Sequence, residues 1–175
     1  MPERMSHQVS LRPAGLEDCR RVWEWRNDEV TREASFYTNY IPYEEHERWF
    51  SRKLTDPHFR IFIAVDSQGH ELGYLRFDIT EGQAEVSVSI DKNERGKGYG
   101  PAVIKRGSQY LMASEPVRRI VAYIKRDNPA SMIAFERAGF ALGGFKQIGD
   151  VEAYEMIYEG SASTGTRAKE PRSPD

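Results

Sequence analysis

The segment covering residues 86–100 constrains the fold and chemistry of this chain more than any other. It starts as a β-branched strand, continues into a loop with glycines at positions 96, 98 and 100, and then opens a helix-like stretch. Glycine permits positive φ and lets a ligand approach the backbone closely. Successive amides in such a loop, beside the partial positive charge of a helix N-terminus, form a concave anion site. The segment therefore predicts a strand, a phosphate-binding loop and a helix, with added positive charge from Arg95 and Lys97.

Two common phosphate motifs do not fit this loop. The dinucleotide fingerprint needs G-x-G-x-x-G, whereas the glycines here are spaced by two. The Walker pattern needs Gly-Lys followed by Ser or Thr, whereas Gly96 and Lys97 are followed by Gly98. Taken alone, the loop is also compatible with an ordinary glycine-rich turn that carries surface charge.

Strand and helix patterns alternate along the rest of the chain. Apolar and polar residues alternate where strands are expected, and a proline at position 42 suits the start of a helix. Helices are expected at residues 16–26, 43–54, 101–114 and 129–138, and strands at 9–12, 60–66, 71–80, 83–91, 119–124, 140–147 and 151–158. This order predicts an α/β chain with a mixed sheet and helices on both faces.

Composition limits the class of protein. The chain has 175 residues, a formal net charge of −2 and one cysteine. These values predict a single domain at residues 8–159, no nucleic-acid partner and a reducing, cytoplasmic location. No apolar run is long enough to span a bilayer, so no membrane partner is expected. Residues 160–175 are mostly Ser, Thr, Gly, Pro and charged residues, which predicts a disordered tail.

Two motifs in order resemble the GNAT superfamily of N-acetyltransferases. Residues 95–100 (RGKGYG) resemble the acetyl-CoA signature R/Q-x-x-G-x-G/A, and residues 128–140 (NPASMIAFERAGF) resemble the element N-x-x-[A/S]-x-x-x-[Y/F]-x-x-x-G-F. The resemblance covers residues 9–158. It implies a mostly antiparallel, splayed sheet of about seven strands flanked by four helices.

The resemblance also implies where acetyl-CoA binds. The pantetheine arm would lie between the strand that ends at Ile90 and the strand 119–124, beside the backbones of Val88 and Ile90. Asn128 would hydrogen-bond this arm, although asparagine is also a preferred helix N-cap. The pyrophosphate would meet the main-chain amides of Arg95, Gly96, Lys97, Gly98, Tyr99 and Gly100.

Two departures from the family pattern affect the chemistry. Pro101 lies in the first helical turn and offers no N–H to a phosphate. Phe135 stands at a cofactor-contacting position where the family often has the tyrosine that protonates the CoA thiolate. Ser131 on the same helix, or a water, is the expected substitute, although a first-turn serine can equally be a solvated surface residue.

The family reaction is direct acetyl transfer to an amine, which must first lose a proton to a base. Glu85 is the first candidate because it lies at the start of the splayed strand. Period-2 alternation places it with Ser87 and Ser89 on one strand face, and it can serve as the base if this face looks into the acceptor cleft. It could instead be a surface carboxylate. Further candidates are His46, Asp78 and Glu33. The four histidines are scattered, so no metal is expected.

The acceptor region carries W-x-W-R-N-D and H-x-x-W-F, which resemble amino-sugar acetyltransferases of the pseudaminic acid pathway and ribosomal-protein N-terminal acetyltransferases. The acceptor would then be a primary amine, for example on a nucleotide-linked amino sugar, with Arg26, Arg32, Arg48 or Arg52 meeting a diphosphate. Substrate contacts are expected from Trp25, Arg26, Tyr37 and His46.

Several alternatives stay open. Trp23, Trp49 and Phe50 could simply be core residues. The acceptor could be a protein N-terminus or a polyamine. The chain could also be a non-catalytic acyl-CoA-binding module that regulates another protein. A homodimer is possible, with the closing strands forming a shared sheet.

Overall fold

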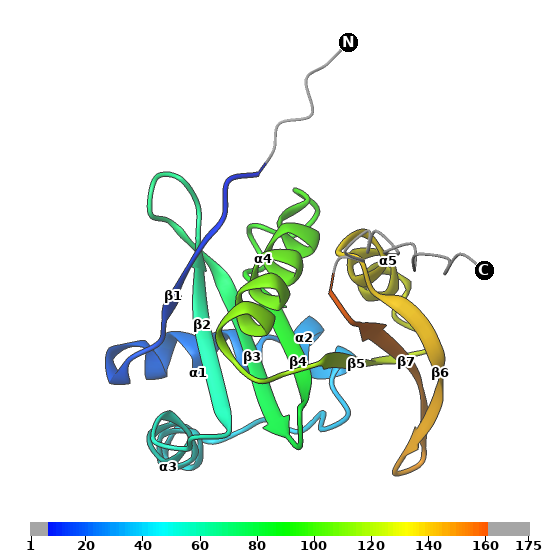
Figure 1. Cartoon of the computed structure of the whole chain (residues 1–175). Helices are drawn as coiled ribbons and strands as arrows, with labels where there is room; N and C mark the ends of the chain where they lie inside the picture. Colours follow the sequence, from blue (N-terminus) through cyan, green and yellow to red (C-terminus); the bar gives the residue numbers. More distant parts are fainter. Residues whose placement is uncertain (1–6, 161–175) are drawn as a thin grey trace, which may run out of the picture.

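A computed structural model describes residues 7–160. Its centre is one seven-stranded sheet in the order β1-β2-β3-β4-β5-β7-β6 (Figure 1). All neighbouring strands are antiparallel except β4 and β5. The strands are β1 (Ser10–Pro13), β2 (Phe59–Val65), β3 (Glu71–Thr80), β4 (Gln83–Ile90), β5 (Arg119–Lys125), β6 (Ala141–Ile148) and β7 (Val151–Tyr158).

Helices cover both faces of this sheet, as the sequence predicted. A short 3-10 turn, η1 (Leu16–Asp18), leads into the first of them. The helices are α1 (Cys19–Asn27), α2 (Glu29–Ala34), α3 (Tyr43–Leu54), α4 (Tyr99–Ser114) and α5 (Pro129–Arg137). Helix α4 lies across β3 and β4 on one face, near α5, while α1 packs with α3 and contacts β3 and β4 from the other (Figure 1).

Each face has its own apolar core. On the α4 side, Val103, Ile104 and Leu111 pack with inward residues of β3, β4 and β5. On the α1 side, Val22 and Trp25 pack with Phe50 of α3 and with β2 residues. The two clusters follow from strand alternation, since successive side chains point to opposite faces.

Two sequence predictions about the first helical region need correction. The expected set of four helices omitted α2, whose residues EVTREA bury no side chain and so leave no apolar stripe to read. The expected stripe of the first helix included Leu16, but Leu16 is 65% exposed because it lies in the 3-10 turn ahead of α1. Helix α4 also begins two residues before the predicted start at position 101.

The sheet splays between its two parallel strands. Strand β4 pairs with β5 only through Gln83–Arg119, Ala84–Ile120 and Glu85–Val121. Beyond Glu85, β4 continues to Ile90 alongside β3 alone. The main-chain groups on its other edge are therefore free of a strand partner over this stretch, which confirms the predicted splayed sheet.

Two further findings bear on the class of protein. Within residues 7–160, no helix combines the length and apolar character needed to cross a membrane. In the same part of the chain, no cluster of three or more His, Cys, Asp or Glu side chains is placed to hold a metal ion. The predicted disordered tail lies outside the described residues, apart from Gly160.

Candidate active site

A cavity of about 700 Å³ runs through the splayed gap in the sheet. Its walls come from β4, the loop that follows β4, the first turn of α4, β5 and α5, and on the opposite side from α2 and the loop after it. Most of the predicted cofactor residues line it, namely Val88, Ile90, Arg95, Gly96, Gly98, Tyr99, Gly100, Asn128 and Phe135. Lys97 is not among the lining residues.

The loop after β4 has the geometry of an anion cradle. Gly96 and Gly98 have φ of 74° and 85°, values that side-chain-bearing residues rarely adopt. Gly98 is the N-cap of α4 and no side chain caps that helix, so the amides of Tyr99 and Gly100 are not used by a cap. Pro101 is the third helical residue and donates nothing. This geometry leaves main-chain N–H groups at the N-terminus of α4, the arrangement that suits an anion.

The charged side chains of this loop are engaged within the protein. Nη2 of Arg95 lies 2.7 Å from Oδ2 of Asp28, and its Nε donates to the carbonyl of Ile90 at 3.1 Å. Lys97 lies 3.1 Å from Glu94. The extra positive charge that the sequence suggested is therefore largely offset. Instead, Arg95 connects the loop to Asp28, the N-cap residue of α2.

Helix α5 closes the far side of the gap. Asn128 is its N-cap, accepting a hydrogen bond from the amide of Ser131 at 3.2 Å, so the helix-capping interpretation is correct. Its side-chain N–H₂ remains as a donor toward the cavity that Asn128 lines. Ser131 also lines the cavity. Phe135 is buried against Phe140, with ring centroids 5.0 Å apart.

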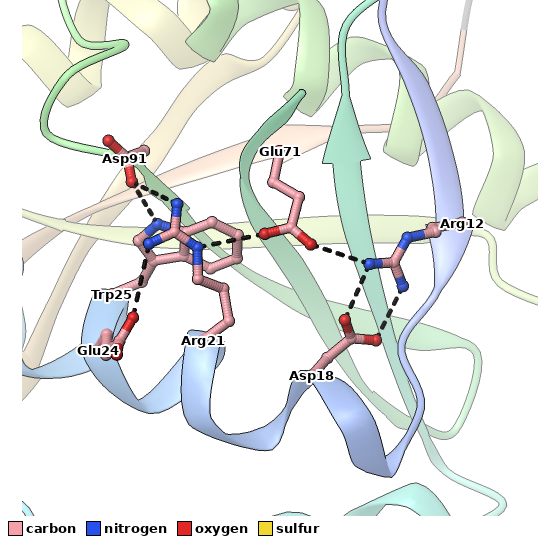
Figure 2. Close-up of polar contacts among 7 residues, drawn as sticks. All are labelled: Arg12, Asp18, Arg21, Glu24, Trp25, Glu71 and Asp91. Carbon is pink, nitrogen blue, oxygen red and sulfur yellow. Dashed lines mark hydrogen bonds and ion pairs between the residues drawn. The ribbon is translucent and has the colours of Figure 1, made fainter. Parts of the chain in front are cut away.

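A chain of polar contacts anchors α1 beside the loop (Figure 2). Glu71 of β3 stands between two arginines, Arg12 and Arg21, each at 3.2 Å. Arg21 and the indole of Trp25 both donate to Asp91, at 3.1 and 2.8 Å. Burial opposes ionisation of Asp91, but these donors outweigh it and lower its pKa. Asp91 directly follows β4, so the network fixes where the loop begins.

Glu85 lies where the two parallel strands separate, and it lines the cavity. It shares a sheet face with Asp78 and with Arg76, as the unbroken β3–β4 register requires. The carboxylate keeps contact with solvent, yet the surrounding walls remove enough water to raise its pKa, and the charge of Asp78 raises it further. A carboxylate with a raised pKa in a cavity is suited to accept a proton.

The predicted acceptor residues separate into two groups. Arg26 and Tyr37 line the cavity, and Nη2 of Arg26 holds the carbonyl of Tyr37 at 3.1 Å. Trp25 does not reach it, because its ring is 4% exposed and its N–H is bound to Asp91. His46 is buried, and its Nε2–H donates to the carbonyl of Cys19 at 3.1 Å.

A second cavity of about 420 Å³ adjoins the first and is lined by His46. Four residues line both cavities: Arg26, Tyr37, Tyr74 and Arg76. Sequence reasoning missed Tyr74 and Arg76 of β3. The available signal was alternation within β3, where Arg76 follows the buried Tyr74 on the same strand face.

A splayed mixed sheet, a main-chain anion cradle and a cavity through the splay together define an acyl-CoA-dependent transferase. Residues 8–141 match the model of the acetyltransferase (GNAT) domain. The chain belongs to this family and is an N-acetyltransferase whose acetyl donor is acetyl-CoA.

Known proteins of similar sequence and fold agree with this assignment. A spermidine N(1)-acetyltransferase of Vibrio cholerae is 23% identical over 80% of this chain and 83% of that protein. An L-methionine sulfoximine/L-methionine sulfone acetyltransferase of Pseudomonas aeruginosa is 28% identical over 78% of this chain and 82% of that protein. The crystal structure of a V. cholerae spermidine N-acetyltransferase with CoA and spermine has a TM-score of 0.78 and 21% identity, covering 86% and 95% of the two chains.

These relatives correct the narrower resemblance drawn from the sequence. They are named for a polyamine and for methionine derivatives, not for a pseudaminic-acid-pathway sugar or a ribosomal protein. The W-x-W-R-N-D segment misled because its second tryptophan and its aspartate are structural: Trp25 holds Asp91, and Asp28 caps α2 and pairs with Arg95.

Proposed function

We propose that this acetyltransferase moves the acetyl group of acetyl-CoA directly to the primary amine of a small molecule bound between the splay and helices α1 to α3. The observation that carries the proposal is the end of the β4–β5 pairing at Glu85, with a cavity running through the opening. Its lining includes the glycine-rich loop after β4 as well as Arg26 and Tyr37. A donor and an acceptor can thus meet from opposite sides of one sheet.

The donor side uses main-chain groups. The amides from Gly96 to Gly100 bind the pyrophosphate, and the free edge of β4 around Val88 pairs with the pantetheine as an added strand would. The side-chain amide of Asn128 donates from the opposite wall. These contacts orient the thioester carbonyl, and a main-chain N–H of β4 stabilises the charge that develops on its oxygen.

Transfer then needs two proton movements. The amine attacks the thioester carbonyl carbon, the C–N bond forms and the C–S bond breaks. Glu85 accepts the proton that the amine loses, directly or through one water. Ser131 or a water protonates the CoA thiolate, since Phe135 has no acidic group. Glu85 and Ser131 are the catalytic residues of this proposal.

The test is acceptor-dependent release of free CoA from acetyl-CoA, measured with a thiol reagent across a panel of primary amines. Replacing Glu85 by Gln keeps shape and removes the base, so kcat should fall by roughly 100-fold or more. Acetyl-CoA binding, measured by calorimetry, should not change. Glu136→Gln on the exposed face of α5 is the matched control and should behave as wild type.

The pH profile gives a second readout. Glu85 must be deprotonated to act, so kcat/KM should rise as pH passes through its pKa, which burial and Asp78 place above the ordinary value for glutamate. The Gln variant should lose this rising limb. Binding of acetyl-CoA with no turnover on any amine would contradict the proposal and would favour the non-catalytic module.

Polyamine acetylation is the second candidate, because the V. cholerae relative is named for spermidine. A protein N-terminus is less well supported, since the acceptor side consists of two adjoining cavities that suit a small molecule. Spermidine and a short peptide with a free N-terminus belong in the panel for this reason.

A further inference from the structure

The second cavity is lined by an unusual set of charged side chains. Four of its lining residues are arginines, and Glu45 is the one acidic residue with them. Arg26 comes from α1, Arg76 from β3, and Arg48 and Arg52 from α3. Three elements far apart in sequence therefore bring positive charge to one hollow.

None of these four arginines forms an ion pair with a carboxylate within residues 7–160. Arginines elsewhere do, including Arg12 with Asp18, Arg60 with Glu115 and Arg126 with Glu152. Within the part of the protein that the structure describes, Glu45 only partly offsets the positive charge around the second cavity.

Two of the arginines have enclosed nitrogens to which no described group is hydrogen-bonded. These are Nη1 of Arg26 and Nε of Arg76, both shielded from solvent. A guanidinium N–H that is out of contact with water and lacks an acceptor is energetically unfavourable. Both residues also line the acyl-transfer cavity, so they stand at the junction of the two cavities.

Neighbouring groups respond to this positive charge. Burial lowers the pKa of Arg26, and the charge of Arg76 lowers it further. Burial lowers the pKa of His46 to about 4, with Arg26 and Arg76 contributing, so this histidine is neutral at physiological pH. The guanidinium of Arg76 lies 5.3 Å from the ring centroid of Trp49, which fixes its plane beside the cavity.

We propose that Arg26 and Arg76 form an oxyanion site for the acceptor, so that the preferred substrate carries a carboxylate or phosphate group in addition to its amine. The inference rests on the proposed acetyl transfer and specifies its substrate class. Carboxylate and phosphate oxygens match the planar guanidinium donors of arginine. The anionic end would occupy the second cavity, while the amine reaches Glu85 at the splay.

This arrangement disfavours a polyamine. A substrate with several ammonium groups would meet four arginines and one glutamate in the second cavity. Like charges placed together in a partly desolvated site repel, and such repulsion is a common means of excluding a wrong ligand. The relative named for methionine derivatives would thus resemble this chain in acceptor chemistry more than the relative named for spermidine.

Matched substrate pairs test the proposal. CoA release is measured with an α-amino acid against its carboxamide, with glucosamine 6-phosphate against glucosamine, and with spermidine. We expect kcat/KM to be at least tenfold higher for the member that carries the anionic group than for the member that lacks it. The pair that shows this preference distinguishes a carboxylate substrate from a phosphate substrate. Equal values within both pairs, or spermidine as the best substrate, would overturn the inference while leaving acetyl transfer itself intact.

Variants of Arg26 and Arg76 test whether these side chains cause the preference for an anionic substrate. Arg76→Gln and Arg26→Gln should raise KM for the anionic substrate by roughly 10- to 100-fold, as expected for charge-assisted hydrogen bonds. KM for the matched substrate that lacks the anionic group should stay unchanged. Arg26→Lys should restore part of the loss. Arg106→Gln, exposed on α4 at the opposite face, is the control. Loss of both substrates to the same extent would refute a role in anion recognition.

A binding measurement separates this inference from the proposed function. With the protein saturated with CoA, so that the cradle is filled, inorganic phosphate and acetate are titrated while thermal stability is followed. A rise in Tm that Arg26→Gln and Arg76→Gln abolish supports the anion site even if no amine in the panel is acetylated. Arg48→Gln and Arg52→Gln, at exposed positions, give the same readout should the inner variants fold poorly. No arginine-dependent shift with either anion contradicts the proposal.

Discussion

The donor and acceptor sides of this acetyltransferase are built from different chemical groups. On the donor side, two glycines with positive φ and the first turn of α4 present main-chain amides, and the nearby charges of Arg95 and Lys97 are paired. On the proposed acceptor side, side chains provide the functional groups, with Glu85 at the splay and Arg26 and Arg76 lining both cavities. One side is defined by backbone conformation and the other by which side chains the fold gathers.

This difference explains why the donor side is easier to recognise from the sequence than the acceptor side. Every member of the family must bind the same donor, and a backbone cradle needs glycine at fixed spacing. An acceptor site can change its specificity through single side chains on α1, α3 and β3. Sequence similarity in the acceptor region is therefore a weak guide to the substrate. Trp25, for example, belongs to the W-x-W-R-N-D motif but donates a hydrogen bond to Asp91.

The largest expected effect comes from Gly98. Its φ of 85° is unfavourable for a β-branched residue, and a Cβ there would lie 3.0 Å from Nε2 of His7. Gly98→Val should rotate the cradle amides and raise KM for acetyl-CoA by roughly 100-fold, from backbone strain and lost charge-assisted hydrogen bonds. KM for the acceptor should not change. An equal rise in both constants would show that the two sides are not separable.

Asp91 connects helix α1 to the loop after β4, because it accepts hydrogen bonds from Arg21 and Trp25. Asp91→Asn keeps the volume but weakens the bonds from Arg21 and Trp25, and about 2 kcal/mol of unfolding free energy should be lost. Denaturant titration measures this. Because the pKa of Asp91 is lowered in the folded protein, its contribution is complete above the unfolded value near pH ~4 and is lost as pH falls through the folded value. The Asn variant should therefore show a shallower stability loss in acid.

Asn128 allows its two roles to be separated. Asn128→Ala removes the N-cap, at about 1 kcal/mol, together with the side-chain donor. Asn128→Asp keeps an acceptor for the amide of Ser131 and replaces the side-chain donor by a negatively charged oxygen. Both variants should bind acetyl-CoA more weakly by calorimetry, while only the alanine variant should lower Tm. Normal acetyl-CoA binding by the aspartate variant would exclude a cofactor contact from this side chain.

Gly96 should give the smallest change. Its φ is 74°, but a Cβ there meets no atom within 4 Å. Gly96→Ala therefore adds strain of about 1 kcal/mol without a steric clash, and KM for acetyl-CoA should rise only several-fold. If this variant were as damaging as Gly98→Val, the bound donor would have to occupy the open space beside Gly96.

The sequence predicted every strand to within two residues at either end, because alternation and turn residues are local signals. It also predicted the helices that bury an apolar stripe. It missed α2, which is held by the cap at Asp28 and the tie to Arg95 and not by burial. The alternation argument placed Glu85 on one strand face with Ser87 and Ser89, but only the register with β5 shows that Glu85 lies where the β4–β5 pairing ends.

By itself the sequence determined the glycine-rich loop between a strand and a helix, since glycine spacing and a helix start after a strand are written in consecutive residues. Only the tertiary structure shows which side chains gather around the second cavity. Arg26, Arg48 and Arg76 lie on α1, α3 and β3, and their charges add only when packing brings these elements around one cavity. Local backbone preferences act over a few residues, whereas the electrostatics of a cavity depends on distances that only the folded chain sets.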